Sequence, residues 1–206
     1  MRMHHAFAAS SCLALLSLAP LANATIIVPM SIEEMVVEAA AIVQGKVLAR
    51  QSAWDAQHRR IYTFTEIQVV DRMFGQMPER IVVRTLGGAV GEVGMRVSGT
   101  PEFADGEDVV LFLRADPLER QHFQVIGMSQ GKYRLQPGAN GQLFAVPSTA
   151  GLAFVRPNNG TLKVDEAMQH PQALSLDALR QRVTAALKTK AQIVPTQPQG
   201  PAVVTP

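Results

Sequence analysis

Ile61-Tyr-Thr-Phe-Thr-Glu-Ile-Gln-Val-Val70 is the stretch that decides the fold class of this chain. β-Branched and aromatic residues fill it, and such residues are enriched in strands because they pack well on a pleated surface. The stretch therefore predicts a β-strand. On its two sides, the polar segment 52–60 predicts a turn and Phe74-Gly-Gln-Met-Pro78 predicts a loop.

Similar runs predict further strands, with turn signals about every ten residues. They lie at 41–49, 80–86, 108–114, 123–126 and 132–135. Gly45 lies inside the first run, where a glycine often marks a bulge or a sharp bend. Asn140-Gly141 and Asn159-Gly160 each separate short β-like runs and predict hairpins. The segment 87–99 holds five glycines and predicts a long irregular loop.

Two short amphipathic helices are predicted beside these strands. Ser31-Ile-Glu-Glu34 has the capping-box pattern and opens a helix to about Ala40. Ser175 precedes a second helix, to about Lys188, whose apolar residues recur at helical spacing. Alternating strand and helix order is absent, so the predicted fold is mainly β: a small antiparallel OB-like barrel with added hairpins and two short flanking α-helices.

The chain divides into three predicted parts. The first, residues 1–24, is a signal peptide, and residues 25–188 form a single β-barrel-type domain. Residues 189–206 contain four prolines, at 195, 198, 201 and 206, and have little to bury. This last part is predicted to be a disordered Pro- and Gln-rich tail.

The first 24 residues have the three regions of a cleavable secretory signal peptide. Arg2 lies in a short basic region, Ala6–Leu21 is almost wholly apolar, and Ala22-Asn23-Ala24 has small residues where signal peptidase requires them. Cleavage is expected before Thr25. A transmembrane anchor is the rival interpretation, but the apolar run is shorter than the roughly 20 residues that a spanning helix needs. The mature protein is therefore expected to be soluble, and periplasmic or secreted.

Composition narrows the functional classes. Cys12 is the one cysteine and lies in the signal region, so the mature domain is expected to fold without a disulfide. Removing residues 1–24 takes away one of 19 basic residues and none of the 17 acidic ones, which leaves a formal charge of +1. This near-neutral balance gives no electrostatic argument for a nucleic-acid partner or a membrane surface.

Two segments are candidate contact surfaces. The glycines of 87–99 are expected to permit bulges and close packing or to form a mobile rim. Long irregular loops on compact domains also often carry binding, which makes 87–99 a candidate contact surface. The glycines there match no phosphate-binding pattern. In the 52–60 turn, Trp54 either closes the barrel end or anchors a partner. The candidate binding residues are Trp54, Gly87, Gly88, Gly91, Gly94 and Arg96.

Gly127-Met-Ser-Gln-Gly131 matches G-x-S-x-G, the nucleophile elbow of α/β-hydrolases. Ser129, Asp165 and His170 would have the right chain order for a triad. However, the segment after Ser129 predicts a strand, whereas the elbow requires a helix. A glycine-flanked bend is favoured, and no catalytic residue is assigned. No metal or cofactor is expected either, because His58, His122 and His170 lie far apart in the sequence and the motifs of zinc sites are missing.

Four motifs follow one another between residues 41 and 114: Ile42-Val-Gln-Gly-Lys-Val47, Val69–Gly75, Ile81-Val-Val-Arg-Thr85 and Gly106–Leu113. Together they resemble netrin-like domains and the tissue inhibitors of metalloproteinases. The resemblance implies an OB-fold barrel of five coiled strands. The longer string from Thr85 to Lys132 also resembles a family of uncharacterised exported bacterial proteins. In the inhibitors an N-terminal cysteine binds the target's zinc, but the expected mature chain begins at Thr25, so inhibition by that mechanism is not expected.

The sequence favours an exported, non-enzymatic binding or accessory module that acts on or with a secreted protein partner. Two alternatives stay open. One is a serine hydrolase that uses Ser129. The other is a structural envelope protein that is tethered or assembled through its Pro-rich tail.

Overall fold

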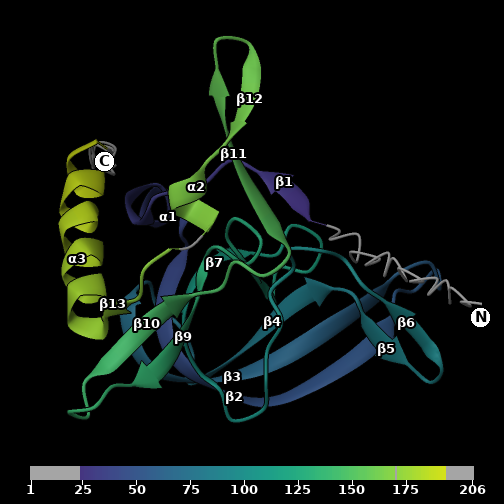
Figure 1. Ribbon diagram of the computed structural model, residues 1–206. Coiled ribbons are helices and arrows are strands. Elements are labelled where there is room, and N and C mark those ends of the chain that lie inside the picture. The colour runs from purple at the N-terminus through teal and green to yellow at the C-terminus, as the bar shows by residue number, and fades with distance from the viewer. Residues whose placement is uncertain (1–23, 170, 194–206) are drawn as a thin grey trace, which may run out of the picture.

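The computed structural model describes residues 24–169 and 171–193, and this part of the chain is mainly β, as predicted (Figure 1). The predicted signal peptide, apart from Ala24, and residues 194–206 of the predicted tail lie outside the described residues. Five strands form a central barrel: β2 (Ala41–Trp54), β3 (Ile61–Phe74), β4 (Arg80–Leu86), β7 (Asp108–Ala115) and β8 (Phe123–Val125).

Backbone pairing joins these five strands into a ring. The order is β7-β2-β3-β4-β8, and β8 pairs with β7 in turn. All neighbours are antiparallel except β4 and β8, which are parallel and pair through Val83 and Phe123. Numbered along the chain, the ring order is 1-2-3-5-4. This Greek-key connectivity agrees with the expected OB-like layout.

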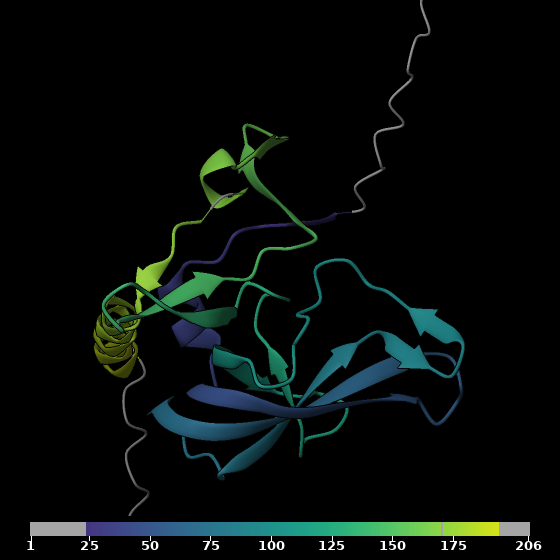
Figure 2. The same ribbon diagram turned by 60° about the horizontal axis from the view of Figure 1, so that its bottom comes forward.

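β2 and β3 are the longest strands, and they curve together across the molecule (Figure 2). Their register shifts between Gln44 and Gly45, which confirms the predicted bulge. A Cβ at Gly45 would lie 2.5 Å from Ile67 Cγ2 and 2.8 Å from the carbonyl oxygen of Gln68. Glycine is therefore required here for β2 to approach β3.

Gly45→Ala is expected to lower the free energy of unfolding by about 1–3 kcal/mol, because the added methyl group meets a fixed neighbouring strand. Gly94→Ala is the matched control, since a Cβ at Gly94 meets nothing within 4 Å. Urea unfolding of both variants measures the effect. Equal stability of the two variants would contradict the steric explanation.

Two hydrophobic cores stabilise the fold, one on each face of the barrel sheet. Residues of all five ring strands fill the barrel interior, among them Val43 and Leu111. Their chain neighbours Ile42 and Phe112 are buried in the second core, between the barrel and the helices. This alternation follows the period of two along a strand.

Three further strands extend the sheet beyond β7: β9 (Lys132–Pro137), β10 (Leu143–Pro147) and β13 (Leu174–Ser175). Two helices pack against each other over the second core: α1 (Ile32–Glu38) and α3 (Leu176–Ile193). Ser31 and Glu34 form the predicted capping box of α1. Ser175 Oγ accepts a hydrogen bond from the Ala178 amide at the start of α3. Both predicted helix starts are thus confirmed.

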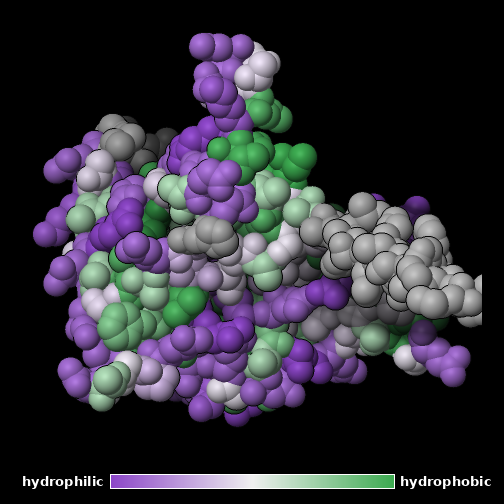
Figure 3. Space-filling model, in the orientation of Figure 1, coloured by the Kyte–Doolittle hydropathy of each residue, from purple (hydrophilic) through white to green (hydrophobic). Residues whose placement is uncertain are grey.

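A three-stranded sheet protrudes from the domain in Figure 1: β1 (Thr25–Ile27), β11 (Leu152–Asn158) and β12 (Thr161–Val164). Asn159 and Gly160 have φ values of 47° and 77° and form the predicted hairpin turn. The Asn140-Gly141 pair lies between β9 and β10, which are also paired as predicted. Figure 3 shows hydrophobic side chains gathered at the base of the protruding hairpin, on a mostly hydrophilic face.

Two predicted loop boundaries were wrong. β2 runs to Trp54, so the turn that was expected at 52–60 begins at Asp55. The segment 87–99 is not wholly irregular, because it contains a hairpin of β5 (Gly88–Val90) and β6 (Val93–Met95). A Cβ at Gly88 would lie 2.4 Å from the hydroxyl oxygens of Ser52 and Thr63. The absence of a side chain at Gly88 therefore allows the β5–β6 hairpin to pack on β2 and β3.

The second helix was expected to be short and to end near Lys188, but α3 continues to Ile193. Lys190 explains the extension, since its Nζ donates to the carbonyl oxygens of Val36 and Ala39 at 3.0 and 3.1 Å. The last turn of α3 is thereby fixed to the end of α1. A short helix, α2 (Glu166–Gln169), was not predicted.

Candidate functional site

The structure places five of the six predicted binding residues at hollows of the surface, and one of them, Arg96, lines two hollows. Trp54, at the end of β2, lines a hollow of about 470 Å³, which we call the aromatic hollow. A second hollow of about 800 Å³, the barrel-mouth hollow, is lined by four others: Gly87, Gly88, Gly94 and Arg96. Gly91 lies in the turn between β5 and β6, where a Cβ would meet nothing within 4 Å.

Four segments form the aromatic hollow: the end of β2, the 55–60 turn, the outer face of β3 and β4, and the 116–122 loop between β7 and β8. Ile61 and Thr65 on β3 are buried, so alternation places Tyr62 and Phe64 on the outer face. Three aromatic residues and three arginines line it: Trp54, Tyr62, Phe64, Arg59, Arg60 and Arg84.

Each aromatic ring of the hollow has a defined neighbour. Trp54 stacks on His58, with ring centroids 6.0 Å apart and an interplanar angle of 21°. Phe64 meets His122 edge-on at 5.2 Å. The Arg84 guanidinium carbon lies 4.3 Å from the centroid of the Tyr62 ring. These contacts hold the rings in place before any partner binds.

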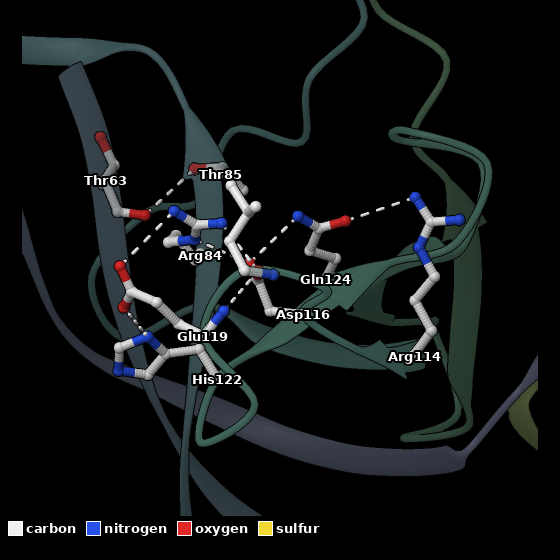
Figure 4. A network of polar contacts seen from close by, with 9 residues as sticks. Thr63, Arg84, Thr85, Arg114, Asp116, Glu119, His122 and Gln124 are labelled. Atoms are coloured by element: carbon white, nitrogen blue, oxygen red, sulfur yellow. Dashed lines mark hydrogen bonds and ion pairs between the residues drawn. The ribbon is translucent and has the colours of Figure 1, made fainter. Parts of the chain in front are cut away.

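Arg84, on β4, connects the hollow to the 116–122 loop (Figure 4). Its Nε and Nη2 donate to the two carboxylate oxygens of Asp116 at 2.6 and 2.7 Å, and both side chains are buried. Asp116 also accepts hydrogen bonds from the amides of Leu118 and Glu119. Burial alone would raise the pKa of Asp116, but these donors outweigh it and hold the pKa below its ordinary value. One buried carboxylate thus organises the loop.

Glu119 completes this network. One of its oxygens lies 3.6 Å from Arg84 Nη1, and the other lies 2.7 Å from His122 Nδ1. The loop is therefore joined to both β4 and the Phe64–His122 contact. Leu118, beside it, is 71 % exposed at the rim of the hollow.

Neither the models of known protein families nor the curated proteins compared with this chain match it. OB-type barrels bind ligands on the face of their second and third strands, between the loop that joins strands one and two and the loop that joins strands four and five. In this ring those elements are β3, β4, the 55–60 turn and the 116–122 loop, which form the aromatic hollow.

The barrel-mouth hollow lies between the β5–β6 hairpin and the ends of β2 and β3, and hydroxyl groups line it. The hydroxyl oxygens of Ser52 and Thr63 are 2.9 Å apart, and Thr63 Oγ1 donates to the Gly87 carbonyl oxygen at 2.7 Å. Thr65 Oγ1 is buried there and has no hydrogen-bond partner in the part of the chain that the structure describes. Gly87 and Gly88 have φ values of 107° and 134°, so backbone geometry alone favours glycine at both positions.

The G-x-S-x-G segment is a bend between β8 and β9, with positive φ at Gly127 and Met128. A strand follows Ser129, so the helix that a nucleophile elbow requires is not there. Ser129 Oγ is buried and has no hydrogen-bond partner among the described residues. Asp165 instead pairs with Arg156 on β11, and His170 lies outside the described residues. The serine-hydrolase hypothesis thus gains no support from this geometry.

A second buried ion pair lies beside Ser129. Lys132 Nζ is 2.8 and 2.9 Å from the two carboxylate oxygens of Glu107, and their side chains are 2 % and 6 % exposed. It also donates to the Glu102 carbonyl oxygen. Burial alone would raise the pKa of Glu107, but the bonds from Lys132 and from the Ala104 amide outweigh it and lower the pKa. The pair holds the turn before β7 against β9.

Residues 24–169 and 171–193 contain neither a metal-ligand cluster nor a membrane-spanning helix. No group of three or more His, Cys, Asp or Glu side chains there is arranged to hold a metal ion. No helix of that part has the length and apolarity that crossing a membrane requires.

Proposed function

We propose that this protein is an exported, non-enzymatic binding module that recognises a protein partner through the aromatic hollow. The observation that carries the proposal is the meeting of Trp54, Tyr62 and Phe64 with arginines at one hollow. Tryptophan, tyrosine and arginine are the residues most enriched at binding hot spots. The hollow also occupies the ligand-binding position of OB-type barrels.

Rigidity of the site supports the same role. The 116–122 loop is held by Asp116, and the rings of Trp54 and Phe64 are packed against histidines. A site that is ordered beforehand loses little conformational entropy when a partner binds. Most of the contact energy then remains available for affinity.

The resemblance to netrin-like domains supports a barrel that acts by contact with another protein. Export rests on the signal-peptide pattern that ends at Ala24. The inhibitory mechanism of the metalloproteinase inhibitors is not part of the proposal, because Cys12 is the one cysteine of the chain.

Trp54→Ala is expected to weaken partner binding about 30-fold, which corresponds to about 2 kcal/mol, because it removes the largest ring of the hollow. The mature protein is used as bait for the exported fraction of the source cells. Each protein recovered is then purified, and its dissociation constant for wild type and variant is measured by titration calorimetry.

Leu162→Ala is the matched control, since Leu162 is an apolar residue on β12 that is 63 % exposed and does not line the aromatic hollow. It should bind like the wild type, and thermal unfolding should show that both variants are folded. A partner that binds the Trp54→Ala variant as tightly as the wild type would refute the aromatic hollow as the binding site.

A further inference from the structure

Three arginines differ from all the others in the described residues. The side chains of Arg59, Arg60 and Arg120 make no hydrogen bond or ion pair, and all three residues are exposed. Each other arginine in residues 24–169 and 171–193 donates to a carboxylate, amide or carbonyl oxygen of the protein. Within the described residues, free guanidinium groups are therefore confined to two short segments.

Those two segments are the walls of the aromatic hollow. Arg59 and Arg60 belong to the 55–60 turn and line the hollow themselves. Arg120 belongs to the 116–122 loop and is the chain neighbour of Glu119, which lines the hollow. Two unpaired cations thus line the hollow, and the third lies in a loop that contributes Leu118 and Glu119 to its lining.

The carboxylates of this region are already occupied. Asp55 accepts a hydrogen bond from the Arg59 backbone amide at 2.7 Å, which is the main reason that its pKa is lowered. Asp116 is bound by Arg84, and Glu119 contacts Arg84 and His122. Three arginines and two carboxylates line the hollow, and the excess positive charge lies on exposed, unpaired side chains.

We infer that the partner presents an acidic segment to this site. Its carboxylates pair with Arg59, Arg60 and Arg120, while an aromatic or apolar side chain enters between Trp54, Tyr62 and Phe64. Arginine suits this task because its planar guanidinium binds a carboxylate through two parallel hydrogen bonds. Exposed charges at the rim also steer an oppositely charged partner and make its association depend on salt. The inference rests on the proposed function and names the class of partner.

The test uses the full mature protein and fluorescein-labelled peptides in which three carboxylate residues lie on each side of one tryptophan. The acidic peptide is expected to bind, and its affinity should fall at least tenfold when sodium chloride rises from 20 to 200 mM. The matched peptide with glutamine in place of each acidic residue should bind at least tenfold more weakly. Fluorescence anisotropy measures both.

The site variant carries Arg59→Gln, Arg60→Gln and Arg120→Gln, and it should lose at least tenfold in affinity for the acidic peptide. The control variant carries Arg80→Gln, Arg114→Gln and Arg156→Gln, which remove the same charge from exposed residues elsewhere. It should bind like the wild type. Circular dichroism checks that both variants are folded.

Three results would overturn the inference: no binding of the acidic peptide up to 1 mM, equal losses in the two arginine variants, or tighter binding at these arginines of a single-stranded oligonucleotide or heparin fragment. The last result would assign the site to another class of polyanion. The natural partner distinguishes the two proposals. If Trp54→Ala abolishes its binding while the site variant binds it with unchanged affinity, the proposed function stands and this inference fails.

Discussion

Asp116→Ala is expected to lower the free energy of unfolding by about 3–5 kcal/mol, because it leaves the Arg84 guanidinium buried without its partner. Asp116 is fully buried and receives both hydrogen bonds from Arg84. The substitution also releases the amides of the 116–122 loop. Urea unfolding followed by circular dichroism measures the loss.

Asp105→Ala is the matched control, since it breaks an exposed ion pair with Arg50 whose side chains are 43 % and 63 % exposed. Such pairs contribute only about 0–1 kcal/mol. The double variant Arg84→Met/Asp116→Leu removes both buried charges and should recover most of the loss. If Asp116→Ala costs no more than Asp105→Ala, the buried pair is not what holds the loop.

The lowered pKa of Asp116 also predicts how stability depends on pH. The unfolded chain binds the proton near the ordinary value, about 3.9, whereas the folded protein binds it only at lower pH. The stability from this group is therefore complete above the ordinary pKa and is lost as the pH falls through the lowered one. The urea midpoint should fall more steeply between pH 6 and pH 3 in the wild type than in the double variant.

Glu107→Ala is the second substitution with a large expected effect, again about 3–5 kcal/mol, because it leaves Lys132 charged and buried. Lys132 is 2 % exposed, and Glu107 binds it through both carboxylate oxygens. The turn that precedes β7 would also lose the bond from the Ala104 amide to Glu107. Guanidinium chloride unfolding gives the free energy.

Asp108→Ala provides the comparison, because Asp108 lies next in the chain and pairs with Lys46 at 4.0 Å with both side chains half exposed. Its loss should cost less than about 1 kcal/mol. Replacing both partners, as in Lys132→Met/Glu107→Leu, should restore stability. A Glu107→Ala variant as stable as Asp108→Ala would show that Lys132 finds water or loses its charge at little cost.

The sequence predicted a helix or strand correctly where that element is determined by residues close together in the chain. The run 61–70 is a strand because its side chains suit a pleated sheet, and the Ser31–Glu34 capping box acts within one helical turn. The prediction of an irregular loop at 87–99 was wrong in part, because Gly88 serves a contact across the fold. Ser52 and Thr63, which are far from Gly88 in sequence, leave no room for a side chain at that position.

The sequence predicted only part of the candidate site. Trp54 was singled out by its residue type, and it does line the aromatic hollow. Tyr62 and Phe64 were missed, although the alternation of residues 61–65 placed them on the face opposite Ile61 and carried the necessary signal. Arg84 and Asp116 are 32 positions apart, and nothing local in the sequence shows that they pair.

The strand ring of the barrel has a consequence for the order of folding. A short turn joins β2 to β3, so their pairing is local in the sequence. The pairing of β2 with β7 brings together residues as distant as Ala41 and Leu113. β8, which closes the ring, follows β7 in the chain. Pairings between distant segments form slowly, because chain entropy is lost before contacts compensate for it. Until β8 docks, the edges of β4 and β7 are open to strands of other chains. The connectivity that builds the aromatic hollow therefore also makes the ring depend on slow pairings between distant segments.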